Sequence, residues 1–248
     1  MRILGVIPAR YASTRFPGKP LAIIQGKTMI QRVYEQALKA KSLKEVVVAT
    51  DDKRIMEHVQ SFGGRVLMTN VNHSSGTDRC NEVLQLLAVE DQVFDVVFNI
   101  QGDEPFINPD QIDKLAKAFD KKDIQIATLI KTISNLAELN NANVVKVVTQ
   151  NTGKALYFSR YSIPFLRLRN LEEAIKNGLY FKHLGIYAYR AKILDEICTL
   201  PKSRLEEAES LEQLRWLENG FAIQTLITEF ESFAIDTPED LSKLTNNA

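Results

Sequence analysis

Short apolar runs that alternate with helical patterns constrain the fold of this chain more than any other feature. The segment Asp95–Gln101 (D-V-V-F-N-I-Q) is apolar at nearly every inner position, whereas a strand with one wet face alternates apolar and polar residues. Similar runs at 3–7 and 45–50 are each followed by apolar residues at helical spacing. Strands that are apolar on both faces are covered by helices on both sides. The first half of the chain therefore predicts a doubly wound, mostly parallel α/β sheet.

The predicted elements of this half follow a regular order of strand and helix. Asp51 or Asp52 can cap the second helix, and Gly63-Gly64 ends it. Strands are expected at 3–7, 45–50, 65–69 and 95–101, and helices at 28–41, after Asp52, at 77–89 and from Asn108-Pro109.

The pattern becomes richer in strands after residue 124. Asn151-Thr-Gly153 is typical of a hairpin turn, and residues 163–181 form an excursion that suggests a lid or a dimer arm. We expect one compact domain over 1–248, with a βαβ part at 1–123 and a smaller β-rich extension at 124–248 that makes the sheet mixed. Strands are expected at 124–133, 144–150, 154–160, 182–190, 222–229 and 232–236, and helices at 191–200, 210–220 and from Pro238.

Charge and composition exclude several classes of protein. Lys plus Arg and Asp plus Glu both number 31, and this balance argues against a nucleic-acid binder, which usually has a basic excess. No apolar run reaches the roughly 18 residues of a membrane span, and the N-terminus does not resemble a signal peptide. Cys80 and Cys198 lie far apart without metal-ligand spacing, so we expect free thiols. These features predict a cytoplasmic protein that binds neither membrane nor nucleic acid.

A cationic loop follows the first predicted strand. It contains Arg10, Arg15 and Lys19, the hydroxyls of Ser13 and Thr14, and a glycine at 18. Glycine lets backbone N–H groups approach an anion, and the cations can donate charge-assisted bonds to phosphate oxygens. The loop has neither the G-x-x-x-x-G-K-[ST] pattern nor G-x-G-x-x-G. Because ligands of open α/β sheets bind at the carboxyl ends of strands, we expect a polyphosphate site here rather than an ordinary solvated loop.

Two carboxylates follow predicted strands elsewhere in the chain. Asp103 lies in Gln101-Gly-Asp-Glu-Pro105, and Asp236 follows the apolar residues before Thr237-Pro238. Asp103 could belong to an ordinary turn, and Asp236 or Thr237 could cap the final helix. Carboxylates at strand ends also suit Mg²⁺, which binds through one or two carboxylates together with substrate phosphates. Combined with the cationic loop, they predict a nucleotidyl transfer in which Lys19, Arg15, Asp103 and Asp236 are catalytic.

Motifs along most of the chain resemble those of sugar nucleotidyltransferases, and most specifically those of the 3-deoxy-manno-octulosonate (Kdo) cytidylyltransferases, also called CMP-Kdo synthetases. Ser74 is a departure, since it stands where the motif often has Gln (HQSGT), and the segment 163–181 is less family-like. The matching motifs, in order, are PARYASTRFPGKP at 8–20, ATD at 49–51, HSSGTDR at 73–79, QGDEP at 101–105, NVVKVV at 143–148, ALYFSR at 155–160, KHLGIYAYR at 182–190, LEQLR at 211–215 and IDTPEDL at 235–241.

This resemblance implies a role for each matching residue. Asp103 and Asp236 would bind Mg²⁺ as the cofactor. The nucleotide, CTP, would be bound by Ala9, Arg10, Ser13, Thr14, Arg15, Lys19, Ser75, Gly76 and Arg79. The sugar acid would be bound by Gln101, Arg160, His183, Tyr187, Glu212 and Gln213.

The residues themselves allow two interpretations of the sugar-acid set. His183 and Tyr187 alternate onto one face of the predicted strand 182–190, which fits either a polar pocket floor or a half-exposed sheet. Arg160 could bind a carboxylate with both arms of its guanidinium. Glu212 and Gln213 lie off the apolar stripe of their helix, where they could reach hydroxyls or simply face solvent. The resemblance favours binding in each case.

We therefore expect CMP transfer from CTP to Kdo with release of pyrophosphate, as a step of lipopolysaccharide biosynthesis, by a homodimer. One alternative keeps the reaction and changes the acceptor to 8-amino Kdo or a sialic acid. Another is a catalytically idle CTP-binding module, but Lys19, Asp103 and Asp236 are all present, which argues against it.

Overall fold

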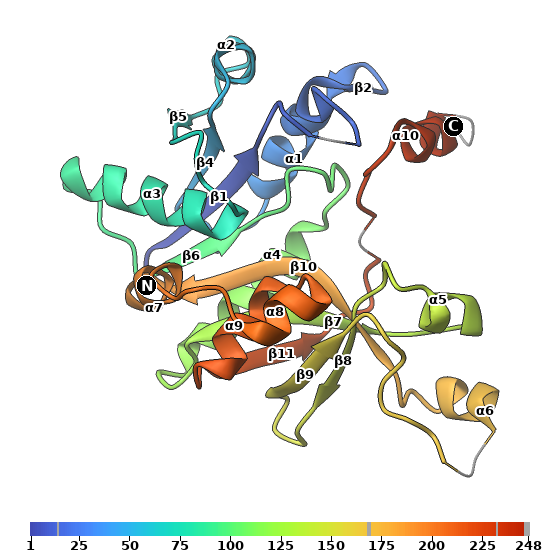
Figure 1. Cartoon of the computed structure of the whole chain (residues 1–248). Helices are drawn as coiled ribbons and strands as arrows, with labels where there is room; N and C mark the ends of the chain where they lie inside the picture. Colours follow the sequence, from blue (N-terminus) through green and yellow to red (C-terminus); the bar gives the residue numbers. More distant parts are fainter. Residues whose placement is uncertain (14, 168–169, 232, 246–248) are drawn as a thin grey trace. The chain divides into compact units, whose positions relative to one another are not determined.

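The computed structural model of the chain describes residues 1–13, 15–167, 170–231 and 233–245 (Figure 1). Its internal contacts divide into two units. The first unit is Met1–Ala116 together with Ser232–Ala248, and the second is Lys117–Glu231. The C-terminal segment therefore belongs to the first unit, although the whole second unit separates them in the sequence. The mixed α/β class predicted from the sequence is confirmed.

The first unit contains a parallel sheet in the order β6-β1-β4-β5. Its inner strands carry the continuous apolar runs, and both faces are buried: Val6, Val47 and Val97 are all fully inaccessible to solvent. The strands are β1 (Ile3–Ala9), β4 (Glu45–Thr50), β5 (Val66–Met68) and β6 (Val96–Asn99), and a small hairpin is formed by β2 (Ile23–Ile24) and β3 (Lys27–Thr28).

The helices of this unit begin at the capping residues that the sequence provides. Thr28 caps α1 by accepting a hydrogen bond from Gln31 N, and Asp52 rather than Asp51 caps α2 through Arg54 N. The buried faces of these helices include Ile30, Ile55 and Leu115. The helices are α1 (Met29–Ala37), α2 (Lys53–Ser61), α3 (Gly76–Val89), α4 (Pro109–Lys117) and α10 (Pro238–Thr245).

The strand order locates a switch point between β1 and β6. The chain moves from β1 to β4 and β5 in one direction through α1 and α2, then returns through α3 to β6 on the other side of β1. Because such crossovers are right-handed, α1 and α2 cover one face and α3 the opposite face. Doubly wound sheets bind ligands beyond the carboxyl ends of the strands at such a point. The cationic loop follows β1 there, and Asp103 follows β6.

The C-terminal segment packs on the back of this loop. Ile235 and Leu241 join a cluster with Phe16, Ile24 and Met29, and Ile235 N donates to Asp103 O at 2.9 Å. The strand predicted at 232–236 is wrong, since residues 233–236 have no strand conformation. The apolar run there reflects the burial of Ile235 in this cluster rather than pairing in a sheet.

The second unit is mostly antiparallel. β10 pairs with β7 and β8, β8 pairs with β9, and β11 runs parallel to β7. The register between β7 and β10 shifts between Leu184 and Tyr187. The strands are β7 (Ile126–Thr132), β8 (Lys146–Thr149), β9 (Ala155–Ser159), β10 (Phe181–Arg190) and β11 (Ile223–Ile227), close to the predicted ranges.

Three short helices of this unit were absent from the sequence prediction, because each is too short to show a helical period. α7 (Ala191–Cys198) and α9 (Glu212–Glu218) agree with it. The three others are α5 (Leu136–Asn140), α6 (Leu171–Lys176) and α8 (Arg204–Glu209). None of the helices in the described part of the chain is long and apolar enough to cross a membrane.

The predicted excursion at 163–181 contains α6 and rests on α5. Ile175 and Tyr180 pack against Ile133 and Leu139 in a small core of their own. A cavity of about 710 Å³ lies beside it, lined in part by Arg160, Tyr161, Phe165 and Glu209. Phe165 and Tyr161 are 87% and 80% exposed. The function of this segment as a lid or a dimer arm stays a prediction.

Candidate active site

The cationic loop turns back on itself between β1 and the short 3₁₀ helix Lys19–Leu21. Ser13 N and Gly18 N both donate to Tyr11 O, at 3.0 and 2.9 Å. Gly18 has a φ of 71°, in the left-handed region that favours glycine. The turn places Lys19 at the edge of the sheet. Thr14, predicted as a nucleotide ligand, lies outside the described residues.

Lys19 joins the two predicted catalytic carboxylates. Its Nζ lies 2.7 Å from Asp103 Oδ2 and 3.2 Å from Asp236 Oδ1. Arg15 adds a second cation, 3.2 Å from the same oxygen of Asp236. The four residues that the sequence predicted to be catalytic thus form one cluster, although their roles stay predictions.

Exposure of these side chains decreases toward Lys19. The side chain of Arg15 is 65% exposed, those of Asp236 and Asp103 are 38% and 23%, and that of Lys19 is 14%. The pair between Lys19 and Asp103 is therefore the least screened by water, whereas the pair between Arg15 and Asp236 is a surface ion pair of small energetic weight.

The final helix is capped by Thr237 and not by Asp236, which resolves the alternative left open by the sequence. Thr237 Oγ1 accepts from Asp240 N at 3.2 Å, and Asp240 Oδ2 accepts from Thr237 N and Asp236 N at 3.1 and 3.3 Å. The Asp236 carboxylate faces Lys19 and Arg15 instead.

Glycines bring three chain segments together at this edge. A Cβ on Gly102 would lie 2.6 Å from Pro8 O, and one on Gly76 would lie 3.3 Å from Pro8 Cγ. The end of β1, the loop after β6 and the start of α3 are therefore in direct contact. Among the other predicted ligands in this unit, Ala9 is buried at the end of β1, Arg10 is exposed and Gln101 is half-buried.

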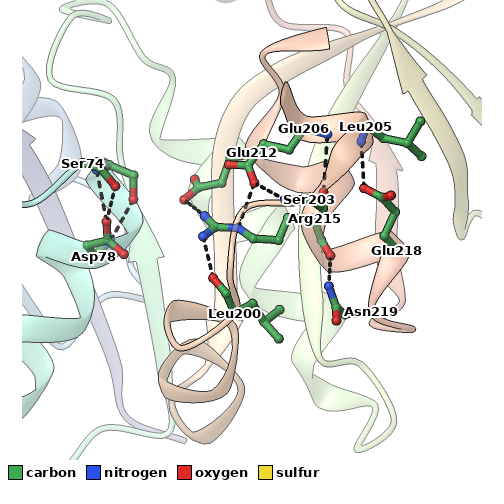
Figure 2. A network of polar contacts seen from close by, with 11 residues as sticks. Ser74, Asp78, Leu200, Ser203, Leu205, Glu206, Glu212, Arg215, Glu218 and Asn219 are labelled. Atoms are coloured by element: carbon green, nitrogen blue, oxygen red, sulfur yellow. Dashed lines mark hydrogen bonds and ion pairs between the residues drawn. The ribbon is translucent and has the colours of Figure 1, made fainter. Parts of the chain in front are cut away.

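Ser75 caps α3. Its Oγ accepts from Asp78 N at 3.1 Å, and Asp78 Oδ2 accepts from Ser75 N at 3.2 Å, which completes a capping box. Ser74 also donates to Asp78 Oδ2, at 3.1 Å (Figure 2). The departure from the family motif at position 74 thus extends the cap of the helix.

Arg79, predicted as a nucleotide ligand, is buried within the protein. It is 1% exposed, and its guanidinium donates to Asp51 Oδ2 at 2.5 Å and to Thr69 Oγ1 at 2.7 Å. Asp51 follows β4, so the matching motifs at 49–51 and 73–79 meet here. The sequence suggested Asp51 only as a possible cap of the second helix, although its position after a buried strand also indicated a site residue.

The predicted sugar-acid residues of the second unit include an aromatic group. His183 lies with its ring centroid 5.3 Å from that of Phe158 and 5.1 Å from that of Tyr187, and Tyr187 lies 5.1 Å from Trp216. Thr128 Oγ1 is 3.1 Å from His183 Nε2. Burial lowers the pKa of His183 to about 3 and raises the pKa of Tyr187. Both side chains are therefore neutral at physiological pH.

Arg160 is held by backbone carbonyls. Its guanidinium donates to Glu209 O at 2.7 Å, to Ala142 O at 3.1 Å and to Ser210 O at 3.3 Å. These contacts fasten the end of β9 to the end of α8 and occupy part of the guanidinium that was predicted to bind a carboxylate. Arginine has five N–H donors, so some capacity remains.

The sequence left open whether Glu212 and Gln213 reach a ligand or face solvent. Glu212 Oε1 accepts from Arg215 at 2.9 Å, and Arg215 also contacts Glu206 and Leu200 O (Figure 2). Gln213 is only 5% exposed. The helical period placed both off the apolar stripe, but α9 is short and packed on more than one side, so Gln213 is buried as well.

The described part of the chain has no group of three or more His, Cys, Asp or Glu that could hold a metal by themselves. Asp103 and Asp236 nevertheless fit a divalent cation. Their oxygens already converge on one positive charge, that of Lys19 Nζ, and Mg²⁺ needs only one or two carboxylates when phosphates complete its shell.

A doubly wound sheet with a cationic loop and two carboxylates at its switch point has the features of a nucleotidyltransferase. The chain belongs to the cytidylyltransferase family, whose family model matches residues 4–229.

Individual relatives show which members of this family the chain is similar to. It is 54% identical to a 3-deoxy-manno-octulosonate cytidylyltransferase of Bacteroides thetaiotaomicron, over 97% of this chain and 96% of the relative. It is 49% identical to an 8-amino-3,8-dideoxy-manno-octulosonate cytidylyltransferase of Shewanella pealeana, over 97% and 96%. A solved CMP:2-keto-3-deoxy-manno-octonic acid synthetase complexed with CTP superposes with a TM-score of 0.90 at 44% identity, over 100% of this chain and 98% of that one.

Proposed function

We propose that this chain transfers CMP from CTP to the anomeric hydroxyl of Kdo and releases pyrophosphate. The observation that carries this proposal is the cluster at the switch point, where Lys19 bridges Asp103 and Asp236. Relatives named for this reaction, with about half of their residues identical over nearly their whole length, support it.

The reaction forms one phosphorus–oxygen bond and breaks another. The anomeric oxygen of Kdo attacks the α-phosphate of CTP, its proton is released, and the bond to the β-phosphate oxygen breaks so that pyrophosphate leaves. Negative charge increases on the leaving group. Lys19 and Arg15 are close enough to the site to offset that charge, and such preorganised contacts contribute about a hundred- to a thousandfold in rate each.

Asp103 and Asp236 are the proposed ligands of a divalent cation, which we propose to be Mg²⁺. When bound, it would add positive charge at the α-phosphate and orient the attacking oxygen. The carboxylate oxygens of Asp103 and Asp236 that now hold the ammonium of Lys19 can bind the cation in its place. Lys19 would then be free to bind phosphate oxygens.

The nucleotide contacts are proposed for the loop after β1 and for the start of α3. The exposed Arg10 can bind phosphate directly, and the backbone of Ser75 and Gly76 lies at a helix N-terminus, where anions are favoured. Arg79 is engaged by Asp51 and Thr69, so its contribution would include holding α3 in place. The full proposed set is Ala9, Arg10, Ser13, Thr14, Arg15, Lys19, Ser75, Gly76 and Arg79.

The proposed Kdo ligands are polar groups of two kinds. His183 and Tyr187 are neutral, so they can exchange hydrogen bonds with sugar hydroxyls without a charge to desolvate. Arg160 supplies the positive charge for the sugar carboxylate. The full proposed set is Gln101, Arg160, His183, Tyr187, Glu212 and Gln213.

We also propose a cytoplasmic homodimer that acts in lipopolysaccharide biosynthesis. Two exposed aromatic residues, Tyr161 just before the 163–181 segment and Phe165 within it, support an interface there, because large exposed apolar side chains mark contact surfaces. Sedimentation velocity of the wild type and of a variant with both residues changed to Ser tests this, and a monomeric wild type would refute it.

The first experiment measures pyrophosphate release with CTP and Mg²⁺, with Kdo, 8-amino Kdo and sialic acid offered in parallel. We expect release with Kdo. Release only with 8-amino Kdo would keep the reaction and change the acceptor, and the 49% identity to the Shewanella relative makes that amino sugar the second candidate. CTP binding without release for any acceptor would indicate an idle CTP-binding module.

Substitutions then test the cluster. Lys19→Ala should reduce turnover by about a hundred- to a thousandfold, and Asp103→Asn and Asp236→Asn should each change the dependence on Mg²⁺. Lys27→Ala is the control, since Lys27 is an exposed lysine of the same unit that pairs with Glu35 at 2.6 Å. Normal turnover of Lys19→Ala, or equal losses in the control, would remove Lys19 from the mechanism.

A further inference from the structure

Tyr11 connects the two ends of the cationic loop, and it has no role in the proposed function described above. Tyr11 O accepts the backbone N–H groups of both Ser13 and Gly18, at 3.0 and 2.9 Å. A single carbonyl therefore ties the start of the loop to its end, and the residue after Gly18 is Lys19. Because Gly18 is covalently bonded to Lys19, a displacement of Tyr11 would also displace Lys19.

The ring of Tyr11 reinforces this closure. A Cβ added to Gly18 would lie 3.2 Å from three atoms of the ring, Cε2, Cζ and Oη. The ring thus packs directly on the backbone of Gly18, which has a left-handed conformation that only glycine adopts without strain. The loop is held both by hydrogen bonds and by this contact.

Arg54, from the first turn of α2, covers the ring of Tyr11. Its Cζ lies 3.2 Å from the ring centroid, within the range of a cation–π contact. Asp52 holds this guanidinium with both carboxylate oxygens, 2.9 Å from Nε and 2.6 Å from Nη2. Hydrogen bonds from Arg54 lower the pKa of Asp52, so the carboxylate stays charged. Asp52 also caps α2, which fixes Arg54 at its base.

We propose that Tyr11 and Arg54 are positioning residues for nucleotide binding: they hold Gly18 against Tyr11 and, through Gly18, fix the place of Lys19 for the triphosphate of CTP. This inference rests on the proposed function, and it adds two residues outside the cluster of Lys19, Asp103 and Asp236. The stack of Arg54, Tyr11 and Gly18 holds the backbone of the loop in place.

The test is steady-state kinetics with both substrates varied, together with CTP binding by calorimetry. Arg54→Ala should raise KM for CTP about two- to fivefold, the size expected for an exposed cation–π contact, and leave KM for Kdo unchanged. Tyr11→Ala should raise KM for CTP by about tenfold or more, because the ring contact with Gly18 is lost as well. Tyr11→Phe keeps the ring and should bind CTP like the wild type.

Arg2→Ala is the matched control, because Arg2 also lies over an aromatic ring of the same unit, 5.0 Å from the centroid of Phe94, and away from the loop. A lower Tm with unchanged KM for CTP in Arg54→Ala would show a purely structural role and overturn the proposal. So would an equal rise in Arg2→Ala. If Tyr11→Ala does not fold, Arg54→Ala and Tyr11→Phe decide the question.

The two proposals fail in different ways. A wild type that releases no pyrophosphate refutes the proposed function. The positioning role is then decided by calorimetry alone, which compares the affinity of the wild type and of Arg54→Ala for CTP. A wild type that turns over normally, with an Arg54→Ala variant that has the same KM and affinity for CTP, refutes only the positioning role.

Discussion

At Gly102 the chain passes so close to β1 that a side chain does not fit. The position of a Cβ atom lies 2.6 Å from Pro8 O, and backbone cannot move aside as a flexible side chain can. The next residue is Asp103, so the close approach also determines where this carboxylate lies. A constraint on one residue thus links the packing of the sheet to the candidate active site.

Gly102→Ala should lower the free energy of unfolding by about 2–3 kcal/mol, the upper range for overpacking a tight contact, and should reduce turnover by moving Asp103. Gly26→Ala is the control, since a Cβ at Gly26 meets nothing within 4 Å and only the positive φ of 82° opposes it. That strain costs about 1–2 kcal/mol. Urea unfolding of both variants measures the difference, and a loss no larger than that of Gly26→Ala would contradict the steric argument.

We expect His183 to make the free energy of unfolding depend on pH. Burial lowers its pKa in the folded state to about 3, from 6.5 in the unfolded chain. Between these values the unfolded state binds the extra proton, so stability is fully present above pH 6.5 and is lost as the pH falls toward 3. The slope from this one group is at most about 1.4 kcal/mol per pH unit.

Denaturant unfolding of the wild type and of His183→Gln should therefore give curves that converge as the pH is lowered from 7.5 to 4.5. At pH 7.5 the histidine is neutral in both states, so the difference there measures packing alone. A difference between the two proteins that stays constant over this range would show that folding does not lower the pKa of His183.

At the scale of single elements, two helices have the same capping box in different surroundings. Ser75 and Asp78 cap α3 beside the cationic loop, and Ser203 and Glu206 cap α8 in the second unit. Each serine accepts from the backbone N–H three residues later. The two helices allow the effect of a cap on stability to be separated from its effect on the site.

Ser75→Ala and Ser203→Ala should each destabilise the protein by about 1 kcal/mol, within the usual range of 0.5–2 kcal/mol for a lost cap. Only Ser75→Ala should also raise KM for CTP, because it alone loosens a helix N-terminus proposed to face the nucleotide. Thermal unfolding and kinetics of both variants test this. An equal rise in KM for Ser203→Ala would show that the effect follows from stability.

At the scale of the whole molecule, the C-terminal segment returns to the first unit and brings Asp236 with it. Ile235 and Leu241 anchor it on Phe16, Ile24 and Met29. The cluster is behind the cationic loop, so the same segment supplies a carboxylate and supports the loop. Removal of this segment should therefore reduce both turnover and stability.

A chain that ends at Glu231 should lose at least a hundredfold in turnover, because Asp236 is absent, and should unfold at a lower temperature because Ile24 and Met29 become exposed. Full-length Asp236→Asn is the comparison: it should lose turnover but keep its Tm. Equal Tm values for the truncated chain and the full-length variant would show that the segment does not stabilise the first unit.

The sequence determined the α/β class, most strands and the family, all of which are confirmed. Continuous apolar runs are a local signal, and burial on both faces follows from them directly. The apolar faces of α1 and α2 were likewise readable from spacing alone, and the sequence narrowed the cap of α2 to Asp51 or Asp52, of which the structure has Asp52. The helices α5, α6 and α8 were not, because five or six residues cannot show a period of 3.6.

Tertiary structure decided which residues meet. Lys19 bonds to Asp103 and Asp236 across 84 and 217 positions of sequence, and no local pattern encodes such a distance. The same is true of Arg79 and Asp51, of Arg160 and the carbonyls that hold it, and of Tyr11 beneath Arg54. Periodicity shows which way a side chain faces along its own element, but its partners depend on how the elements pack, and this is why the candidate site was complete only in three dimensions.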